Sequence, residues 1–108
     1  MAQFDVHRNK GALRESIPFV VLVQSAQFDR YRRRVVVPLV RRSALPANMP
    51  VATRLNPVLT VQGVELVLHT LDLVSVPVDQ IGEYIGSLAD QGQCITEALD
   101  ELLTRSWE

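Results

Sequence analysis

The sequence has few cysteines, no long apolar run and no recognisable signal peptide, and each of these excludes a class of protein. Cys94 is the only cysteine, so an internal disulfide is excluded. The longest apolar runs, such as FVVLV at residues 19–23, are far shorter than the ~20 residues of a membrane-spanning helix. The opening MAQFDVHRNK lacks the apolar core of a signal peptide. We therefore expect a cytoplasmic protein that does not engage a membrane.

The sequence also lacks an excess of either charge. Eleven basic residues (Lys+Arg 11) stand against 12 acidic ones, and the formal net charge is -1. This balance predicts neither a nucleic-acid-binding protein nor a membrane-surface protein, unless a local patch provides the charge. The 108 residues are expected to form one domain, 1–108. A domain of this size covers only about two-thirds of its surface on folding, so dimerisation would help it.

Groupings of residues that catalyse reactions are missing as well. His7 and His69 have no cysteine or acidic motif at metal-ligand spacing. We see no glycine-rich phosphate loop and no serine nucleophile elbow. Cys94 has no activating neighbours in the sequence, so we expect an inert, partly buried thiol. The sequence therefore predicts a protein that is not an enzyme and that uses neither a metal nor a cofactor.

The first two-thirds of the chain has the texture of strands. Phe4 and Val6 alternate with polar residues, which predicts a strand with one buried face. The run at 19–23 is apolar on both faces, so it is either covered on both sides or lies in an interface. RVVVPLV at 34–40 is similar, and Pro38 within it indicates an edge or a bulge where the ladder opens.

Later segments predict a long loop, a hairpin and a second interrupted strand. Residues 43–57 hold three prolines and no period, which is typical of an ordered loop, with room for one helical turn. VLTV and VELVLHTL flank Gln62-Gly63 at the spacing of a two-residue hairpin. SVPV at 75–78 contains Pro77, which has no N–H to give a sheet, so this stretch is a bend, an edge or a docked segment.

The helix is the clearest element. An apolar stripe with helical spacing consists of Ile95, Ala98, Leu99, Leu102 and Leu103. Asp90 and Gln93 have the spacing of a capping box, and Gly92 between them weakens the start of the helix. Together with the strand patterns, this stripe predicts one amphipathic helix packed on a small antiparallel sheet, which is a mainly β, α+β fold.

Two groups of basic residues have no structural explanation in the sequence. They are Arg8, Lys10 and Arg14 in the first part, and Arg30, Arg32, Arg33 and Arg34 around Tyr31. Such groups either bind phosphate or carboxylate groups or form solvated strand ends. Trp107, the only tryptophan, is either anchored on the body of the protein or offered to a partner.

Five segments together closely resemble the CcdB family of toxins from bacterial toxin–antitoxin modules. They are QFDV, FVVLVQS, RRVVVPL, NPVLTV and SVPVDQIG. The resemblance implies an SH3-like antiparallel sheet that forms a partly open barrel, one C-terminal helix and a homodimer. It also implies that SVPV is the bend where the last long strand leaves the sheet, with Pro77 ending the pairing.

The same resemblance implies a toxin that poisons DNA gyrase. It would bind the breakage-reunion subunit of gyrase and trap the enzyme on cleaved DNA, without itself contacting a specific nucleic acid. A CcdA-like antitoxin would neutralise it. The implied target-binding residues are Leu103, Thr104, Arg105, Ser106, Trp107 and Glu108. For the antitoxin we assign the basic residues Arg8, Lys10, Arg14, Arg30, Arg32 and Arg33.

The C-terminal tail departs from the family pattern. Gyrase-poisoning members end in a tryptophan-glycine-isoleucine-like tail, where this chain has Thr104, Arg105 and Ser106. Trp107 follows three residues later, which on a helix is ~4.5 Å further along and rotated by ~300°. Two alternatives therefore remain: a CcdB-like protein with a lost or altered target, and a MazF-like ribonuclease that uses Arg30–Arg34 with His69.

Overall fold

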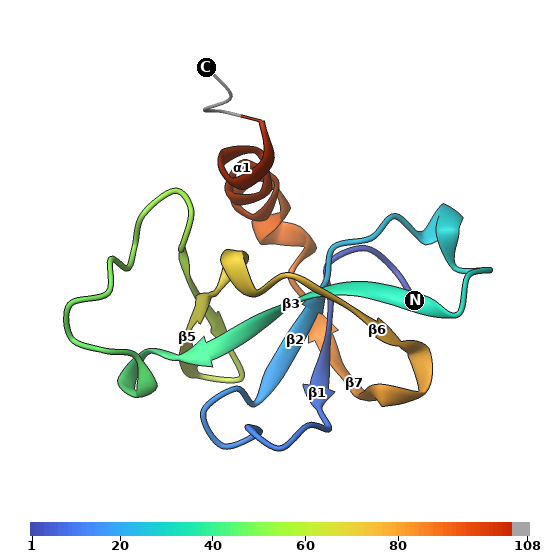
Figure 1. The fold of residues 1–108 in the computed structure, drawn as a ribbon, viewed down its shortest axis with the longest axis horizontal. Coiled ribbons are helices and arrows are strands. Elements are labelled where there is room, and N and C mark those ends of the chain that lie inside the picture. The colour runs from blue at the N-terminus through green and yellow to red at the C-terminus, as the bar shows by residue number, and fades with distance from the viewer. Residues whose placement is uncertain (105–108) are drawn as a thin grey trace.

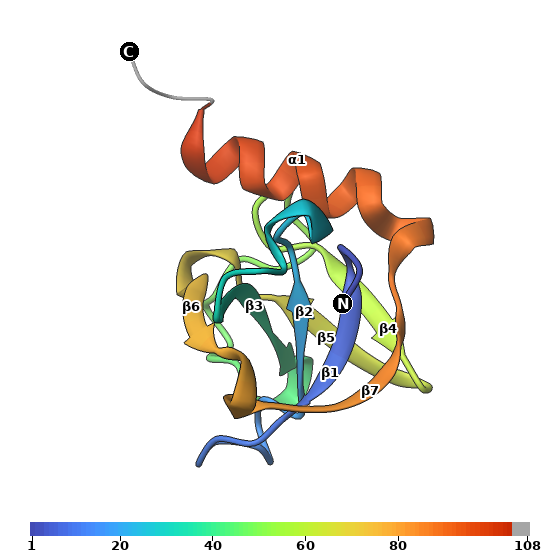
Figure 2. The same cartoon turned by 90° about the vertical axis from the view of Figure 1, so that its right-hand side faces the viewer.

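In the part of the chain that the structure describes, seven antiparallel strands form one curled, half-open barrel, and one helix lies over one end of it (Figures 1 and 2). The structure, a computed structural model, describes residues 1–104. In chain order the elements are β1 Asp5–Asn9, β2 Phe19–Leu22, β3 Arg33–Arg41, β4 Val58–Val61, β5 Val64–Leu68, β6 Val74–Pro77, β7 Ile81–Ser87 and α1 Gly92–Leu103. The expected mainly β, α+β class and partly open barrel are confirmed.

Strand β3 is the centre of the sheet. The strand order is β4-β5-β3-β2-β1-β7, and β6 also pairs with β3. On one edge, β3 pairs with β2 without a register shift. On its other edge, residues 33–36 pair with β6 and residues 39–41 pair with β5. Pro38 lies next to this change of partner: its carbonyl oxygen accepts a bond of 3.0 Å from the N–H of His69, but it has no N–H to give in return. The ladder therefore opens at Pro38 as expected, but the strand is neither an edge nor bulged there.

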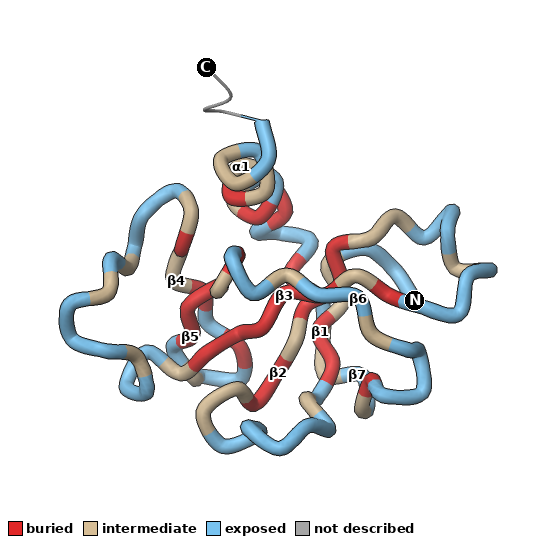
Figure 3. Tube along the Cα trace, in the orientation of Figure 1, coloured by how far each residue is buried: buried red, intermediate tan, exposed pale blue. Residues whose placement is uncertain are grey.

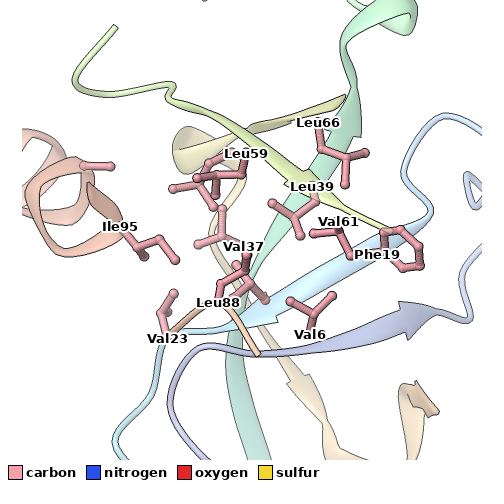
Figure 4. Close-up of a cluster of buried hydrophobic side chains, with 13 residues drawn as sticks. Val6, Phe19, Val23, Val37, Leu39, Leu59, Val61, Leu66, Leu88 and Ile95 are labelled. Carbon is pink, nitrogen blue, oxygen red and sulfur yellow. The ribbon is translucent and has the colours of Figure 1, made fainter. Parts of the chain in front are cut away.

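Strand β2 is covered on both faces, as its apolar texture predicts. On one face Phe19 and Val21 belong to the main core, which is built from the inner face of the sheet and from α1 (Figures 3 and 4). On the other face Leu22 packs with Val36 and Ile81 in a second, smaller cluster. Curling the sheet is what creates this second cluster, because it brings β7 back toward β3.

Strand β1 is buried on both faces, which corrects the expectation of one buried face. Val6 packs in the main core, whereas His7 on the other face is also buried. The ring of His7 lies 5.7 Å from that of Tyr84, and its Nδ1 is 3.0 Å from the carbonyl oxygen of Gly82. Both contacts come from β7, a strand that the sequence pattern did not reveal.

The SVPV segment is an edge strand, not the bend that the resemblance implied. Residues Val74–Pro77 form β6, and Pro77 itself pairs with Arg33. The bends are two 3-10 turns on either side, Thr70–Asp72 and Val78–Gln80. The chain then enters β7, which pairs with β1 through two register shifts. Glycines and exposed polar residues in β7 hide its strand character in the sequence.

The hairpin and the long loop agree with the sequence. Gln62 and Gly63 both have positive φ, 50° and 76°, which suits a two-residue turn between antiparallel strands. The loop before it begins with the 3-10 turn Arg42–Ala44. Its far end is fixed because the buried Thr70 donates a hydrogen bond of 2.6 Å to the carbonyl oxygen of Leu55.

The helix starts as the stripe predicts but not with the predicted cap. Asp90 lies in a 3-10 turn, and the N-cap is Gln91, whose side chain makes no capping bond. The capping-box prediction is therefore wrong. The helix start is fixed instead by packing, because a Cβ on Gly92 would lie 2.8 Å from the ring of Phe4. At the other end the apolar stripe leaves the core, and Leu103 is 68% exposed.

Gly82 allows β7 to approach β1. A Cβ at this position would lie 2.6 Å from the carbonyl oxygen of Arg8, which is backbone and cannot rotate away. We predict that Gly82→Ala lowers the free energy of unfolding by about 1–3 kcal/mol, as measured by urea denaturation. Gly86→Ala is the matched control on the same strand, because a Cβ there meets no atom within 4 Å. Equal stability of the two variants would contradict this close approach.

Candidate functional site

A hollow of about 670 Å³ lies between the C-terminal half of α1 and the segment that joins β2 to β3. We call it the α1 groove. It is lined by Val23, Gln24, Ser25, Phe28, Tyr31, Arg32, Arg33, Val35, Leu73, Leu99 and Leu103. The helix provides one wall and the β2–β3 segment provides another, so the groove depends on elements that are far apart in the sequence.

Large apolar side chains at this groove are exposed to solvent. Leu103 is 68% exposed, Tyr31 62% and Phe28 45%. The two aromatic rings are 6.3 Å apart between centroids and tilted at 47°. Exposed apolar side chains that gather in one place are typical of an interaction surface. The groove is therefore suited to binding an apolar part of another protein.

The β2–β3 segment is held in place by hydrogen bonds. The side chain of Gln24 accepts a bond of 3.1 Å from the N–H of Val35 and donates to the carbonyl oxygen of Phe28 at 3.5 Å. Ser25 caps the 3-10 turn Ala26–Phe28, and the N–H of Tyr31 donates to the carbonyl oxygen of Phe28 at 3.1 Å. These bonds give the aromatic wall a defined backbone.

The structure describes only two of the six predicted target-binding residues, Leu103 and Thr104. Leu103 lines the groove, and Thr104 follows it as the C-cap of α1. The N–H and the hydroxyl of Thr104 both donate to the carbonyl oxygen of Asp100, at 2.9 and 3.0 Å. The remaining members, Arg105, Ser106, Trp107 and Glu108, lie outside the described residues.

The structure separates the predicted antitoxin-binding residues into two groups. In the second group, Arg32 and Arg33 line the α1 groove, and Arg30 is exposed in the turn before them. Arg33 is also tied to β6, because it donates to the side-chain and backbone oxygens of Ser75 at 2.9 and 2.7 Å. This group therefore lies beside the apolar groove.

The first group surrounds a different hollow. Arg8, Lys10 and Arg14 line it together with Glu83, which forms an ion pair with Arg8. Lys10 donates a hydrogen bond of 3.0 Å to the carbonyl oxygen of Asp79. Part of the positive charge of this group is thus balanced within the protein.

The connector Val78–Gln80 lies between the two basic groups. Lys10 bonds to Asp79 on one side, and the N–H of Val78 donates to the carbonyl oxygen of Arg32 at 2.8 Å on the other. A partner that contacts both groups therefore has to pass this connector. Nothing in the sequence alone indicates this arrangement.

The residues named for a ribonuclease do not converge. The N–H of His69 bonds to the carbonyl oxygen of Pro38, whereas Arg34 is four residues away along the extended β3, which is ~13 Å. Nδ1 of His69 lies 3.0 Å from Asp72, and within residues 1–104 there is no group of three potential metal ligands. Burial, aided by the charge of Glu97, raises the pKa of the Cys94 thiol, which makes it a poor nucleophile at neutral pH.

Comparison with known proteins agrees with the fold and the motifs. The family model described as CcdB protein matches residues 3–104, which is nearly the whole chain. The chain belongs to the CcdB family. Membership implies a toxin of a toxin–antitoxin module. A search of curated proteins found no match.

In residues 1–104, no helix is both long enough and apolar enough to cross a membrane.

The sequence revealed only part of the aromatic wall of the groove. Tyr31 was noted as part of a basic group, whereas Phe28 was missed, because both residues lie in a polar segment without any period.

Proposed function

We propose that this CcdB-family protein is the toxin of a type II toxin–antitoxin module and that it binds the breakage-reunion subunit of DNA gyrase through the α1 groove. Binding would trap gyrase on cleaved DNA, so the toxin would act in the cytoplasm by association and not by catalysis. The observation that supports this best is the position of Leu103. It ends α1 as a 68% exposed leucine on an apolar groove, at the start of the predicted target-binding segment.

The energetics of this surface favour a protein partner. Full burial of one leucine side chain is worth roughly 1.5–3 kcal/mol, and exposed aromatic residues add to this when a partner covers them. Tyrosine is also enriched among the residues that dominate binding energy. The Phe28, Tyr31 and Leu103 side chains therefore form a small, contiguous set of candidate anchors.

An altered target is the second candidate, and one observation favours it. Thr104 stands where the family pattern has tryptophan, and its side chain is engaged in capping α1 through the carbonyl oxygen of Asp100. This position therefore offers a partner a short, polar side chain. Under the gyrase proposal, Leu103 and the aromatic wall have to provide the apolar contacts, with Trp107 as the remaining aromatic candidate in the tail.

We expect the protein to be a homodimer. A small domain with exposed apolar side chains is more stable when a second copy covers part of them. A dimer would also present paired surfaces to a symmetric target. Light scattering at micromolar concentration is predicted to give about twice the chain mass of 12.1 kDa. A monomer at this concentration would contradict the dimer and the simple paired-surface mechanism.

Leu103→Ala is predicted to weaken binding to the purified breakage-reunion subunit of gyrase. If Leu103 is an anchor, its truncation costs 2 kcal/mol or more, which is roughly a thirtyfold loss of affinity. The matched control is Leu71→Ala, because Leu71 is 66% exposed and does not line the groove. Trp107→Ala and truncation after Leu103 test the tail in the same assay, with accumulation of cleaved DNA as the second measurement.

Two results would count against this function. Equal binding by the Leu103→Ala and Leu71→Ala variants would remove the groove from the interface. If the unaltered protein neither arrests growth on induction nor traps cleaved DNA, the gyrase target is wrong and the altered-target candidate replaces it.

The antitoxin is proposed to carry an acidic segment that docks near the two basic groups. Reversing the charge of Arg32 and Arg33 is predicted to slow association, most strongly at low ionic strength, because charge steers encounter more than it adds affinity. Stopped-flow kinetics with the cognate antitoxin measure this effect, and Arg42→Glu at the other end of β3 is the control. An unchanged association rate at every salt concentration would leave these arginines as a solvated strand end.

A further inference from the structure

Arg34 differs from its basic neighbours because its side chain points into the protein. It is only 6% exposed, although it belongs to the run RYRRR. Burying a guanidinium is costly unless hydrogen bonds to its N–H groups offset the loss of water. The acceptors here are backbone carbonyl oxygens: Nη1 donates to Tyr31 and, at 3.0 Å, to Arg33, and Nη2 donates to Asp29 at 2.9 Å.

These bonds organise the turn that carries the aromatic wall of the α1 groove. Nε of Arg34 also lies 3.5 Å from a carboxylate oxygen of Asp29, and the other oxygen of Asp29 lies 3.1 Å from the N-terminal amine. The bonded carbonyls of Asp29 and Tyr31 are one and three residues after Phe28. Arg34 therefore fixes the backbone on which both exposed rings stand.

The two rings depend on the backbone of this turn, which bonds of Gln24 and Ser25 also help to fix. Phe28 and Tyr31 are 45% and 62% exposed, so the core does not fix their positions. Without a fixed backbone, a partner would have to order this turn on binding, at a cost in affinity. A bond network anchored on a buried cation removes that cost before the partner arrives.

We infer that Arg34 is a positioning residue for binding at the α1 groove, and that the Phe28–Tyr31 wall which it holds determines how well a protein partner fits there. The inference rests on the proposed binding of gyrase for its affinity test. It predicts that Arg34 acts on binding through the two rings and not by direct contact.

A double-mutant cycle that uses the gyrase breakage-reunion subunit tests this route. Phe28→Ala/Tyr31→Ala removes the wall, and Arg34→Lys keeps the charge but loses the planar fork of donors. We expect each change alone to weaken binding by roughly tenfold or more. We expect Arg34→Lys to have no further effect once both rings are gone, because interacting residues are not additive. Additive losses would overturn the inference.

Hydrogen exchange in the free protein tests the positioning step without any partner. Arg34→Lys is expected to speed the exchange of the Phe28 and Tyr31 amides while leaving the β4–β5 hairpin amides unchanged. Arg33→Lys is the control, because Arg33 is exposed and bonds to Ser75 on β6. Unchanged exchange at the turn, or equal acceleration everywhere, would overturn the positioning role.

The inference can still be tested if the Arg34→Lys variant does not fold or if the protein does not bind gyrase. If Arg34→Lys does not fold, Asp29→Asn replaces it, because this change removes the carboxylate near Arg34 and keeps the backbone carbonyl that Arg34 bonds. It is expected to accelerate exchange at the same amides to a smaller extent, and no acceleration would overturn the inference. If the unaltered protein does not bind the breakage-reunion subunit, the proposed target fails, and the exchange experiment still decides the role of Arg34.

Discussion

The structure depends on the change of partner along strand β3. One edge of this strand pairs with β6 over residues 33–36 and with β5 over residues 39–41, and Pro38 lies close to the break. Because β6 is held beside the start of β3, the chain between β5 and β6 brings Leu73 to the α1 groove. The same end of β3 provides Arg34, which holds the aromatic turn. The change of partner on one edge of β3 therefore positions two parts of the groove, Leu73 and the aromatic turn.

The helix completes the groove because its two ends are packed differently. Its start is locked by the contact between Phe4 and Gly92. Ala98 is fully buried, and so is Ile95, which points into the core (Figure 4). Its last turn has no such cover, so Leu103 reaches solvent. A helix anchored at one end and exposed at the other is a rigid support for a binding segment.

Much of the fold follows from local patterns, whereas the groove does not. The hairpin at Gln62-Gly63, the two-faced β2 and the apolar stripe of α1 are properties of short segments, so the sequence predicts them. Strand β7 was missed because its pairing with β1, and not its own apolar pattern, stabilises it. Arg34 looks like its exposed neighbours in the sequence, since only the fold decides which arginine of the run is buried.

We propose the α1 groove as the surface that meets the target. Hydrogen-exchange footprinting of the protein with and without the gyrase breakage-reunion subunit tests it most directly, because it maps contact without altering a residue. We predict protection in three segments that are distant in sequence: residues 24–34, the stretch around Leu73, and residues 99–104 at the end of α1. Protection confined to the loop after β1 and to strand β7, with the groove segments unchanged, would contradict it.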